Sequence, residues 1–342
     1  MARLTGAAGV PLRVECLSEV EREALRWPRL QALVTHAWEA SPLYRARWRG
    51  LGGPGVIRTP ADLQRLGLTS RAEIAADQAA HPPWGALATA PPESFVAVHR
   101  SGGPQPLYWY DDPASWSWVQ GLWDHVYRAA GVGPGDRIFF AFAFAPVLWY
   151  WAGFERAQEL GMLALTGGAM TQLQRVQNLF DLGATVLVTT PQEGLELAQA
   201  AAAHGFHPAK SPLRAILYAG RPGDDPGAVG RSLEAAWGAE PFCVTWLTEA
   251  GITGYECPAH PGGVHLLASE IYAEVIDPET GRPLPPGEEG ELVVTPLGRL
   301  AMPVIRYRTG DRVRLAAGPC ACGRTFPLLM GGIRGRVGGE GR

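Results

Sequence analysis

Two acidic residues stand where they could hold a nucleotide and its metal ion. Glu249, preceded by Thr248, lies in the segment VTWLTEAG, and Asp311 ends the segment PVIRYRTGD. The apolar run before Thr248 predicts a strand that delivers Thr248 and Glu249 to its carboxyl end, where parallel sheets bind ligands. A carboxylate and a hydroxyl at such a place suit a magnesium ion and the phosphates that accompany it.

A second group of residues carries the side chains of a zinc site. Cys257-Pro-Ala-His260 offers a thiolate and an imidazole from one short loop, and Cys320-Ala-Cys322 offers two more thiolates. Three thiolates and an imidazole suit a tetrahedral structural zinc ion. His265 is an alternative fourth ligand, and the plainer interpretation is that these are reduced thiols beside a surface histidine.

Composition narrows the class of protein. The 342 residues are 46% hydrophobic and include 43 glycines, which fits a globular α/β protein with a large core. The net charge of −3, from 30 basic and 33 acidic residues, predicts small-molecule partners rather than nucleic acid or a membrane. No apolar run reaches the roughly 20 residues of a membrane span, and the first residues lack a signal-peptide pattern, so we expect a cytoplasmic protein.

Alternating strands and helices fill the middle of the chain. Helices are predicted at 148–160, 170–182, 193–204 and 225–238, between strands at 162–166, 184–190, 213–220 and 241–247. This alternation predicts a parallel sheet with helices on both faces. We expect four regions: a helical amino-terminal lobe (1–94), an α/β nucleotide-binding core (95–256), an antiparallel β lobe with the zinc site (257–332) and a truncated hinge or tail (333–342).

Several segments, in one order along the chain, resemble the phenylacetate–coenzyme A ligase family of adenylate-forming enzymes. They are LQALVTHAWEASPLYRARW, LTGGAMTQLQRVQNLFDLGATVLVTTP, WLTEAGITGYEC, EVIDPETGRPLPPGEEGELVVTPL, MPVIRYRTGD and GPCACGRTFP. The resemblance implies the large-domain fold of these ligases. It also implies ATP-dependent activation of an aryl or acyl carboxylate to an acyl-AMP, transfer of the acyl group to coenzyme A, and a homodimer.

The resemblance assigns roles to individual residues. Glu249 and Thr248 would act beside the magnesium ion and the nucleotide, and Asp311 would bind the ribose hydroxyls of AMP. The loop 219–221 would lie against adenine. The expected nucleotide contacts other than Asp311 are Ala219, Gly220, Tyr307, Arg336, Ser101 and Gly102. Arg306 and Arg308 alternate with Tyr307, and we expect them either on a solvated face or on a phosphate.

The sequence departs from the family at three places. The phosphate loop is SGGPQP, without threonine or lysine, and its prolines have no N–H to offer a phosphate. The small carboxyl-terminal domain that carries a catalytic lysine is expected to be absent, and Lys210 is the only lysine. In the expected acyl pocket, Trp149, Tyr150 and Trp151 replace a glycine-rich segment, either as ordinary core aromatics or as a filled pocket.

These departures leave two functional hypotheses. The first is a ligase-like enzyme that uses ATP or AMP, magnesium and coenzyme A, with activity that is impaired or depends on a partner. The second is a non-catalytic protein that binds a nucleotide or another protein and keeps the ligase fold and the zinc ion. The intact YRTGD and WLTEAG segments favour the first hypothesis, and the altered phosphate loop favours the second.

Overall fold

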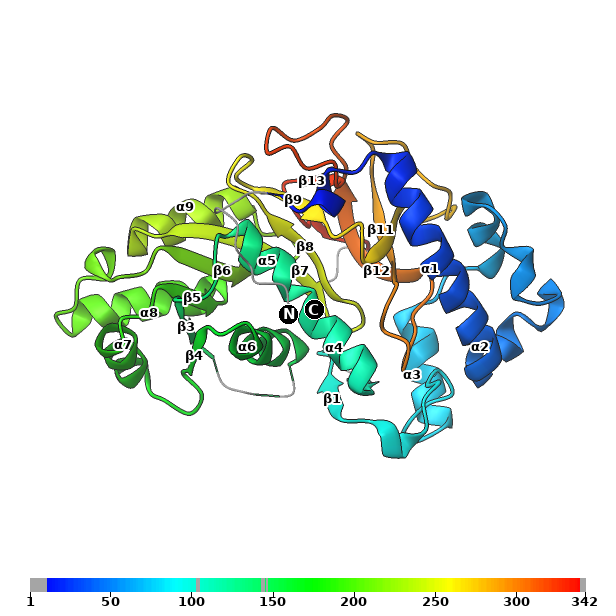
Figure 1. Ribbon diagram of the computed structural model, residues 1–342, viewed down its shortest axis with the longest axis horizontal. Helices are drawn as coiled ribbons and strands as arrows, with labels where there is room; N and C mark the ends of the chain where they lie inside the picture. Colours follow the sequence, from blue (N-terminus) through cyan, green and yellow to red (C-terminus); the bar gives the residue numbers. More distant parts are fainter. Residues whose placement is uncertain (1–10, 103–104, 143–144, 146, 339–342) are drawn as a thin grey trace.

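The computed structural model describes residues 11–102, 105–142, 145 and 147–338. The amino-terminal helices are η1 (Arg13–Cys16), α1 (Glu19–Ala40), α2 (Pro42–Arg47), η2 (Arg49–Leu51), η3 (Pro54–Val56), η4 (Pro60–Leu66), α3 (Arg71–Ala80) and η5 (Pro92–Ser94). Of these, α1, α2 and α3 lie together at one end of the molecule (Figure 1). The predicted capping boxes are confirmed: Ser18 and Glu21 cap α1, and Ser70 and Glu73 cap α3. Each pair satisfies backbone N–H groups that a helix end leaves open.

Within the described part of the chain, eight strands form the large sheet, in the order β13-β9-β8-β7-β6-β5-β3-β4. Strands β3 to β7 run parallel, whereas β8, β9 and β13 continue the sheet in antiparallel fashion. Their bounds are β3 (Arg137–Phe140), β4 (Leu163–Thr166), β5 (Val186–Thr189), β6 (Ala215–Ala219), β7 (Glu240–Leu247), β8 (Gly251–Glu256), β9 (Gly263–Leu266) and β13 (Leu328–Met330). The predicted α/β architecture with a parallel sheet is therefore confirmed.

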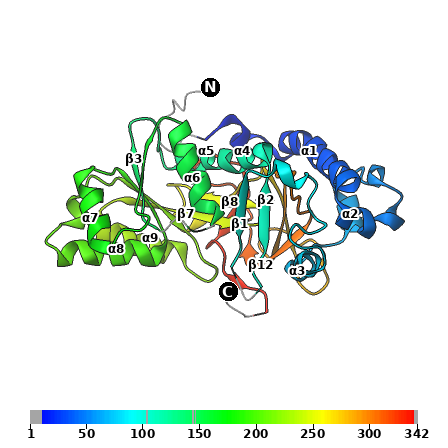
Figure 2. The ribbon, with the colours of Figure 1, turned by 90° about the horizontal axis from the view of Figure 1, so that it is seen from below.

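Helices cover both faces of this sheet (Figure 2). One layer holds α7 (Gln172–Asp181), α8 (Pro191–Ala203) and α9 (Pro226–Trp237), and the other holds α4 (Pro113–Gly121), α5 (Trp123–Ala129) and α6 (Leu148–Glu159). Side chains of one strand alternate between two separate cores, because successive residues of a strand point to opposite faces. Ile216 and Tyr218 of β6 join the first core, and Leu217 joins the second.

A smaller antiparallel sheet, in the order β10-β11-β12-β14, packs beside the amino-terminal helices (Figure 1). Its strands are β10 (Ile271–Ile276), β11 (Glu289–Pro296), β12 (Tyr307–Arg314) and β14 (Gly335–Arg336). The expected antiparallel lobe, 257–332, does not map onto this sheet alone. Strands β9 and β13 lie in that range but pair with the large sheet, and β14 lies beyond it.

A hairpin of β1 (Ala97–Arg100) and β2 (Tyr108–Asp111) carries the phosphate-loop segment. The short helix η6 (Pro208–Lys210) precedes β6. No helix among the described residues is both long and apolar enough to cross a membrane.

Candidate functional site

Thr248 and Glu249 lie where the strand direction of the large sheet reverses. Strand β7 runs parallel to β6 and antiparallel to β8, and the turn between β7 and β8 contains both residues. The turn ends at Gly251, whose φ is +76° and where a Cβ atom would lie 2.6 Å from Leu122 Cδ1. Only glycine fits this backbone and this gap. The predicted delivery of Thr248 and Glu249 to the carboxyl end of a strand is therefore confirmed.

The Glu249 carboxylate is fully buried but only half satisfied. Its Oε1 atom accepts hydrogen bonds from Tyr307 Oη at 3.1 Å and from an Arg71 guanidinium nitrogen at 3.2 Å. Its Oε2 atom is buried without a hydrogen-bond partner among the described residues. Burying a carboxylate oxygen without a partner costs free energy, so Oε2 is suited to bind a metal ion. The oxygen donors of Glu249 and Thr248 are of the kind that magnesium prefers.

Arg71 supplies a cation that the sequence reasoning missed. One of its guanidinium nitrogens donates to Ser101 Oγ at 3.0 Å, and the other donates to the carbonyl oxygens of Gly102 and Gln105 at 2.6 and 2.8 Å. Arg71 is the first residue of α3, so the capping box at Ser70 locates it in sequence. Nothing in the sequence signals that its side chain reaches a loop 30 residues away.

The structure brings Gly220, Asp311 and Arg336 to one hollow of about 200 Å³. Asp311 is 1% exposed and forms an ion pair with Arg336, across the pairing of β12 with β14. Gly220 follows β6, and a Cβ atom there would lie 2.6 Å from Cys243 Sγ. The full lining is Tyr150, Thr190, Ala219, Gly220, Arg221, Pro222, Trp246, Leu247, Asp311, Ile333 and Arg336.

A buried ion pair supports the turn that carries Thr248. Arg299 is 1% exposed and binds both oxygens of Asp111, with Nε 2.7 Å from Oδ1 and NH2 2.6 Å from Oδ2. Its third nitrogen donates to the Thr248 carbonyl oxygen. Burial alone would raise the pKa of Asp111, but the Arg299 guanidinium and His99 hold it below its usual value. The pair therefore ties the hairpin β1–β2 to the turn, a link that sequence reasoning did not find.

The aromatic and arginine alternatives are resolved by packing. Trp149, on α6, is fully buried, with its ring centroid 5.1 Å from that of Trp123, whereas Tyr150, also on α6, lines the hollow. One of the crowding aromatics is thus core and another borders the candidate site. Arg306 pairs with Glu274, and Arg308 pairs with Glu291, so both guanidinium groups are engaged within the antiparallel sheet; Arg306 is buried, whereas a third of the Arg308 side chain is exposed.

Four possible metal ligands converge at the far end of β8. Among the described residues, ligand atoms of Cys257, His265, Cys320 and Cys322 all lie within 4.8 Å of one another. This group contains His265 in place of the expected His260. The reason lies in the strands: His265 sits inside β9, which pairs with both β8 and β13 and thereby faces the cysteine loops.

The spacing of these atoms suits zinc. Cys257 Sγ lies 3.7 Å from Cys320 Sγ, and Cys322 Sγ lies 3.4 Å from His265 Nε2. Two thiolates bound at about 2.3 Å to one tetrahedral zinc ion would lie roughly 3.8 Å apart. His265 Nδ1 is 3.1 Å from the Phe326 carbonyl oxygen, which can only accept. Nδ1 therefore carries the proton and Nε2 turns its lone pair toward the cysteines.

The electrostatics of the cluster call for a cation. Burial, together with the neighbouring Cys322 and Cys320 thiols, raises the pKa of Cys257 to about 12. Burial also lowers the pKa of His265, which keeps its imidazole neutral and able to ligate. Burial opposes ionisation of Cys322, but hydrogen bonds from Arg324 outweigh it and lower the pKa of that thiol. A bound dication would allow all three thiols to ionise.

The Glu15 carboxylate connects the amino-terminal segment to the cysteine–histidine cluster. Glu15, fully buried in η1, receives hydrogen bonds from Tyr255 Oη at 2.7 Å and from Arg324 Nε at 2.9 Å, and its Oε1 lies 2.9 Å from His125 Nδ1. Burial alone would raise the pKa of Glu15, but His125 and Arg324 lower it to about 2. Arg324 also donates its backbone N–H to Cys322 Sγ at 3.4 Å, so η1 and the cluster share one polar network.

Comparison with known proteins gives a consistent result. The chain is 30% identical over 327 residues to the phenylacetate-coenzyme A ligase of Pseudomonas putida, covering 93% of this chain and 71% of that protein. It is also 30% identical over 334 residues to the phenylacetate-coenzyme A ligase of Thermus thermophilus. This match covers 95% of this chain and 72% of that protein. No family model matches the chain.

Solved structures agree with the sequence comparison. A 2-hydroxyisobutyryl-CoA ligase, in an open conformation with 2-HIB-AMP and CoA, superposes with a TM-score of 0.90 at 28% identity. That match covers 95% of this chain and 77% of the ligase. The expected large-domain fold of the adenylate-forming ligases is therefore confirmed.

Proposed function

Because this chain belongs to the phenylacetate–coenzyme A ligase family of adenylate-forming enzymes, we propose that it binds an adenine nucleotide with magnesium and activates a small-molecule carboxylate as an acyl-adenylate. The observation that carries this proposal is the hollow that collects Gly220, Asp311 and Arg336 from β6, β12 and β14. These elements lie far apart in sequence and meet at the carboxyl ends of parallel strands, where α/β sheets bind ligands.

Asp311 would accept hydrogen bonds from the ribose hydroxyls, and the loop 219–221 would face adenine. Asp311 is buried and already paired with Arg336, so a ribose must share or displace that guanidinium. An exchange of this kind needs no creation of a buried charge, because the carboxylate keeps a polar partner throughout. Gly220 lets this loop pack against Cys243, which would fix the backbone that faces the base.

Glu249 and Thr248 would hold the magnesium ion. The support is the buried Glu249 Oε2 atom without a partner, next to an Oε1 atom that Tyr307 and Arg71 fix in place. A magnesium ion bound there would neutralise the negative charge of the ATP phosphates. The substrate carboxylate could then attack the α-phosphorus and release pyrophosphate. Arg299 keeps the turn in position through the Thr248 carbonyl oxygen.

Arg71 would act at the phosphate end, where the loop carries no lysine. Its guanidinium already touches Ser101 and Gly102, the two residues expected in the phosphate loop. Lys210 does not serve this end: it is exposed in η6, just before the amino end of β6, at the sheet edge opposite the hollow. We therefore propose that activation of the carboxylate is impaired in this chain or depends on a partner, because Arg71, the cation beside the phosphate loop, is already bound to the carbonyl oxygens of Gly102 and Gln105.

We also propose that Cys257, His265, Cys320 and Cys322 hold a structural zinc ion. The convergence of four donors within 4.8 Å and the Nδ1 hydrogen bond of His265 support this set over one with His260. Four protein ligands leave no open coordination position, so such an ion would contribute stability and no chemistry.

A non-catalytic nucleotide-binding protein is the second candidate function. It is favoured by the bonds of Arg71, which bind the carbonyl oxygens of Gly102 and Gln105. A phosphate could use this guanidinium only after it had broken those bonds, which would weaken ATP binding and leave AMP binding intact. Release of pyrophosphate from ATP with a panel of carboxylates separates the two functions.

The experiment that tests nucleotide binding replaces Asp311. Asp311→Asn keeps the shape of the side chain but loses its charge, and we expect the affinity for AMP to fall at least about tenfold. Glu289→Gln is the matched control, because Glu289 also pairs with Arg312 and Arg334 on the antiparallel sheet but does not line the hollow. Equal AMP affinity in Asp311→Asn and wild type, measured by calorimetry, would refute the ribose contact.

A further inference from the structure

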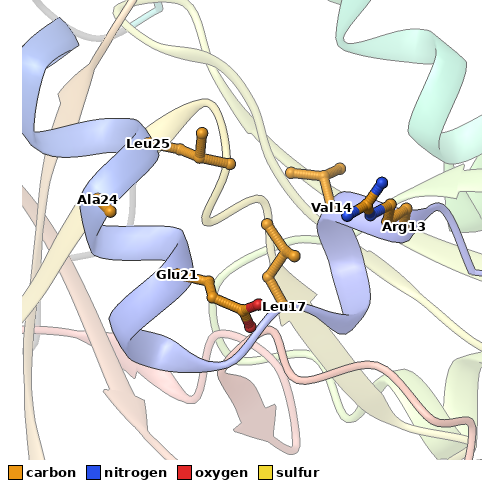
Figure 3. Close-up of a pocket in the computed structure, with 6 residues that line it drawn as sticks. All are labelled: Arg13, Val14, Leu17, Glu21, Ala24 and Leu25. Carbon is orange, nitrogen blue, oxygen red and sulfur yellow. The ribbon is translucent and has the colours of Figure 1, made fainter.

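Two hollows outside the nucleotide site differ in what their walls offer a ligand. The one between η1 and α1 encloses about 560 Å³, and its charged residues, Arg13 and Glu21, are exposed beside aliphatic side chains (Figure 3). The other, which we call the α9 cavity, encloses about 360 Å³ and has the buried carboxylate of Glu256 in its wall. Water solvates an exposed charge, whereas a buried charge requires an opposite charge nearby. The α9 cavity therefore specifies the charge of its ligand.

The α9 cavity lies between α9, the start of β7 and the end of β8. Four prolines contribute to its walls, and no aromatic side chain is among its described lining residues. It shares no lining residue with the hollow around Asp311. Its volume is at the lower end of the roughly 300–1,000 Å³ that is typical of small-molecule sites. The cavity thus suits a small ligand that is independent of the nucleotide.

The Glu256 carboxylate is buried without a counter-charge. Glu256 is 5% exposed, and its two oxygens accept hydrogen bonds from the backbone N–H groups of Cys243 at 2.7 Å and Gly262 at 2.6 Å. No cationic side chain among the described residues forms an ion pair with it. A carboxylate can accept about four hydrogen bonds, so about two positions remain open. A cationic group in the cavity would use these positions and compensate the buried charge.

The remaining charges of the lining indicate a ligand with two positive charges. Glu234 and Glu240 also line the cavity, and Arg231 is the one cation among its described lining residues. Three carboxylates against one guanidinium leave a net charge of −2 when all are ionised. The match in charge therefore favours a dication.

The spacing of the carboxylates favours an organic dication over a metal ion. A divalent metal ion needs several ligand atoms that converge on one point. Among the described residues, the cysteine–histidine cluster shows this convergence, and the carboxylates of Glu234, Glu240 and Glu256 do not form such a group. Carboxylates that stand apart suit two positive charges that are separated by a carbon chain.

We propose that the α9 cavity binds a small aliphatic diamine. One ammonium group donates to Glu256, the second lies near Glu240 at the mouth, and the carbon chain packs against the prolines. A primary ammonium group carries three N–H donors and can therefore serve the open positions of Glu256. A quaternary ammonium is a poorer fit, because such ions are bound by aromatic side chains, which the described lining lacks.

The test is calorimetric titration of the full chain with 1,4-diaminobutane, in the absence of nucleotide. We expect saturable binding at one site, and Glu256→Gln should bind at least about tenfold more weakly, because hydrogen bonds to a buried charge are lost. Glu240→Gln, at an exposed position, should weaken binding only about two- to fivefold. Glu196→Gln is the matched control, because Glu196 is an exposed carboxylate on α8 outside the cavity. A folded wild type that does not bind the diamine at millimolar concentrations would overturn the proposal.

Glu256→Gln alters a buried group, so two further measurements use chains that keep Glu256. The monoamine 1-aminobutane has one charge and should bind to the wild type at least about fivefold more weakly than the diamine. Arg231→Ala removes the like charge from the lining and should bind the diamine about two- to fivefold more tightly. Equal affinities for the two amines would contradict the proposal. Displacement of the diamine by an equal concentration of calcium chloride would assign the cavity to a metal ion and also overturn it.

Discussion

The cysteine–histidine cluster and the hollow around Asp311 differ in whether their polar groups already have partners of opposite charge. In the cluster, four donors converge, and burial together with the neighbouring Cys322 and Cys320 thiols raises the pKa of Cys257 to about 12. In the hollow, Asp311 already binds Arg336; at the neighbouring turn, Arg71 binds one oxygen of Glu249 and leaves the other without a partner among the described residues. A cation would therefore relieve a strain in the cluster, whereas a nucleotide must compete with existing ion pairs in the hollow.

This difference is the one we expect between the proposed structural zinc site and the proposed nucleotide site. Binding to a complete, enclosed donor set adds its free energy to folding, as structural zinc does. In the hollow, a ligand must replace existing ion pairs, so its binding free energy is only the difference between the old and the new interactions. A modest binding free energy of this kind suits a ligand that must also be released. We therefore expect large stability effects from the cluster and smaller effects, specific to binding, from the hollow.

The largest effect should follow from loss of the cluster. Cys320→Ser should release zinc and lower the free energy of unfolding by more than about 4 kcal/mol, because a buried metal site is lost as a unit. Cys16→Ser is the control, since Cys16 is exposed and outside the cluster. Metal analysis and urea unfolding measure both consequences. A wild-type protein that contains no zinc after purification without chelators would contradict the expectation.

The second effect concerns the network around Glu15 that joins η1 to the cluster. Its pKa is lowered from 4.5 to about 2, so Glu15 stabilises the fold above pH 4.5, and this contribution is lost as the pH falls toward 2. Glu15→Gln should cost about 3 kcal/mol near neutral pH and progressively less below pH 4.5. Glu234→Gln, an exposed carboxylate on α9, is the control. A stability difference that does not change with pH, in urea unfolding, would refute the assignment.

The smallest effect should follow from replacement of Arg71, which lies beside the phosphate loop. Arg71→Ala should weaken ATP binding by about 2 kcal/mol while AMP binding changes less, because a charged hydrogen bond to the outer phosphates is lost. Arg71→Lys should restore part of the ATP affinity, and Arg65→Ala, on exposed η4, should leave both affinities unchanged. Equal losses of ATP and AMP affinity would mean that Arg71 only shapes the loop.

The sequence predicted the parts of the fold that follow from local pattern. The capping boxes at Ser18 and Ser70, the alternation of helices and strands between 148 and 247, and the end of the strand before Thr248 depend on neighbours within a few residues. Such features can be derived from periodicity and hydrogen-bond chemistry alone.

Features that depend on distant pairing could not be predicted. His265 faces the cysteines only because β9 pairs with β8 and β13, whereas His260 is closer to Cys257 in the sequence. Arg71 reaches Glu249 across 178 residues, and Arg299 reaches Asp111 across 188. Each of these contacts is set by tertiary packing, for which a single sequence offers no local signal.

The most direct test of the proposed function is calorimetric titration of the wild-type chain with AMP in the presence of magnesium, followed by ATP under the same conditions. The hollow built by Gly220, Asp311 and Arg336 predicts saturable binding of AMP at one site. ATP should compete for that site. A folded protein that takes up neither nucleotide, with no heat of binding and no change in melting temperature, would contradict the assignment of the hollow as a nucleotide site.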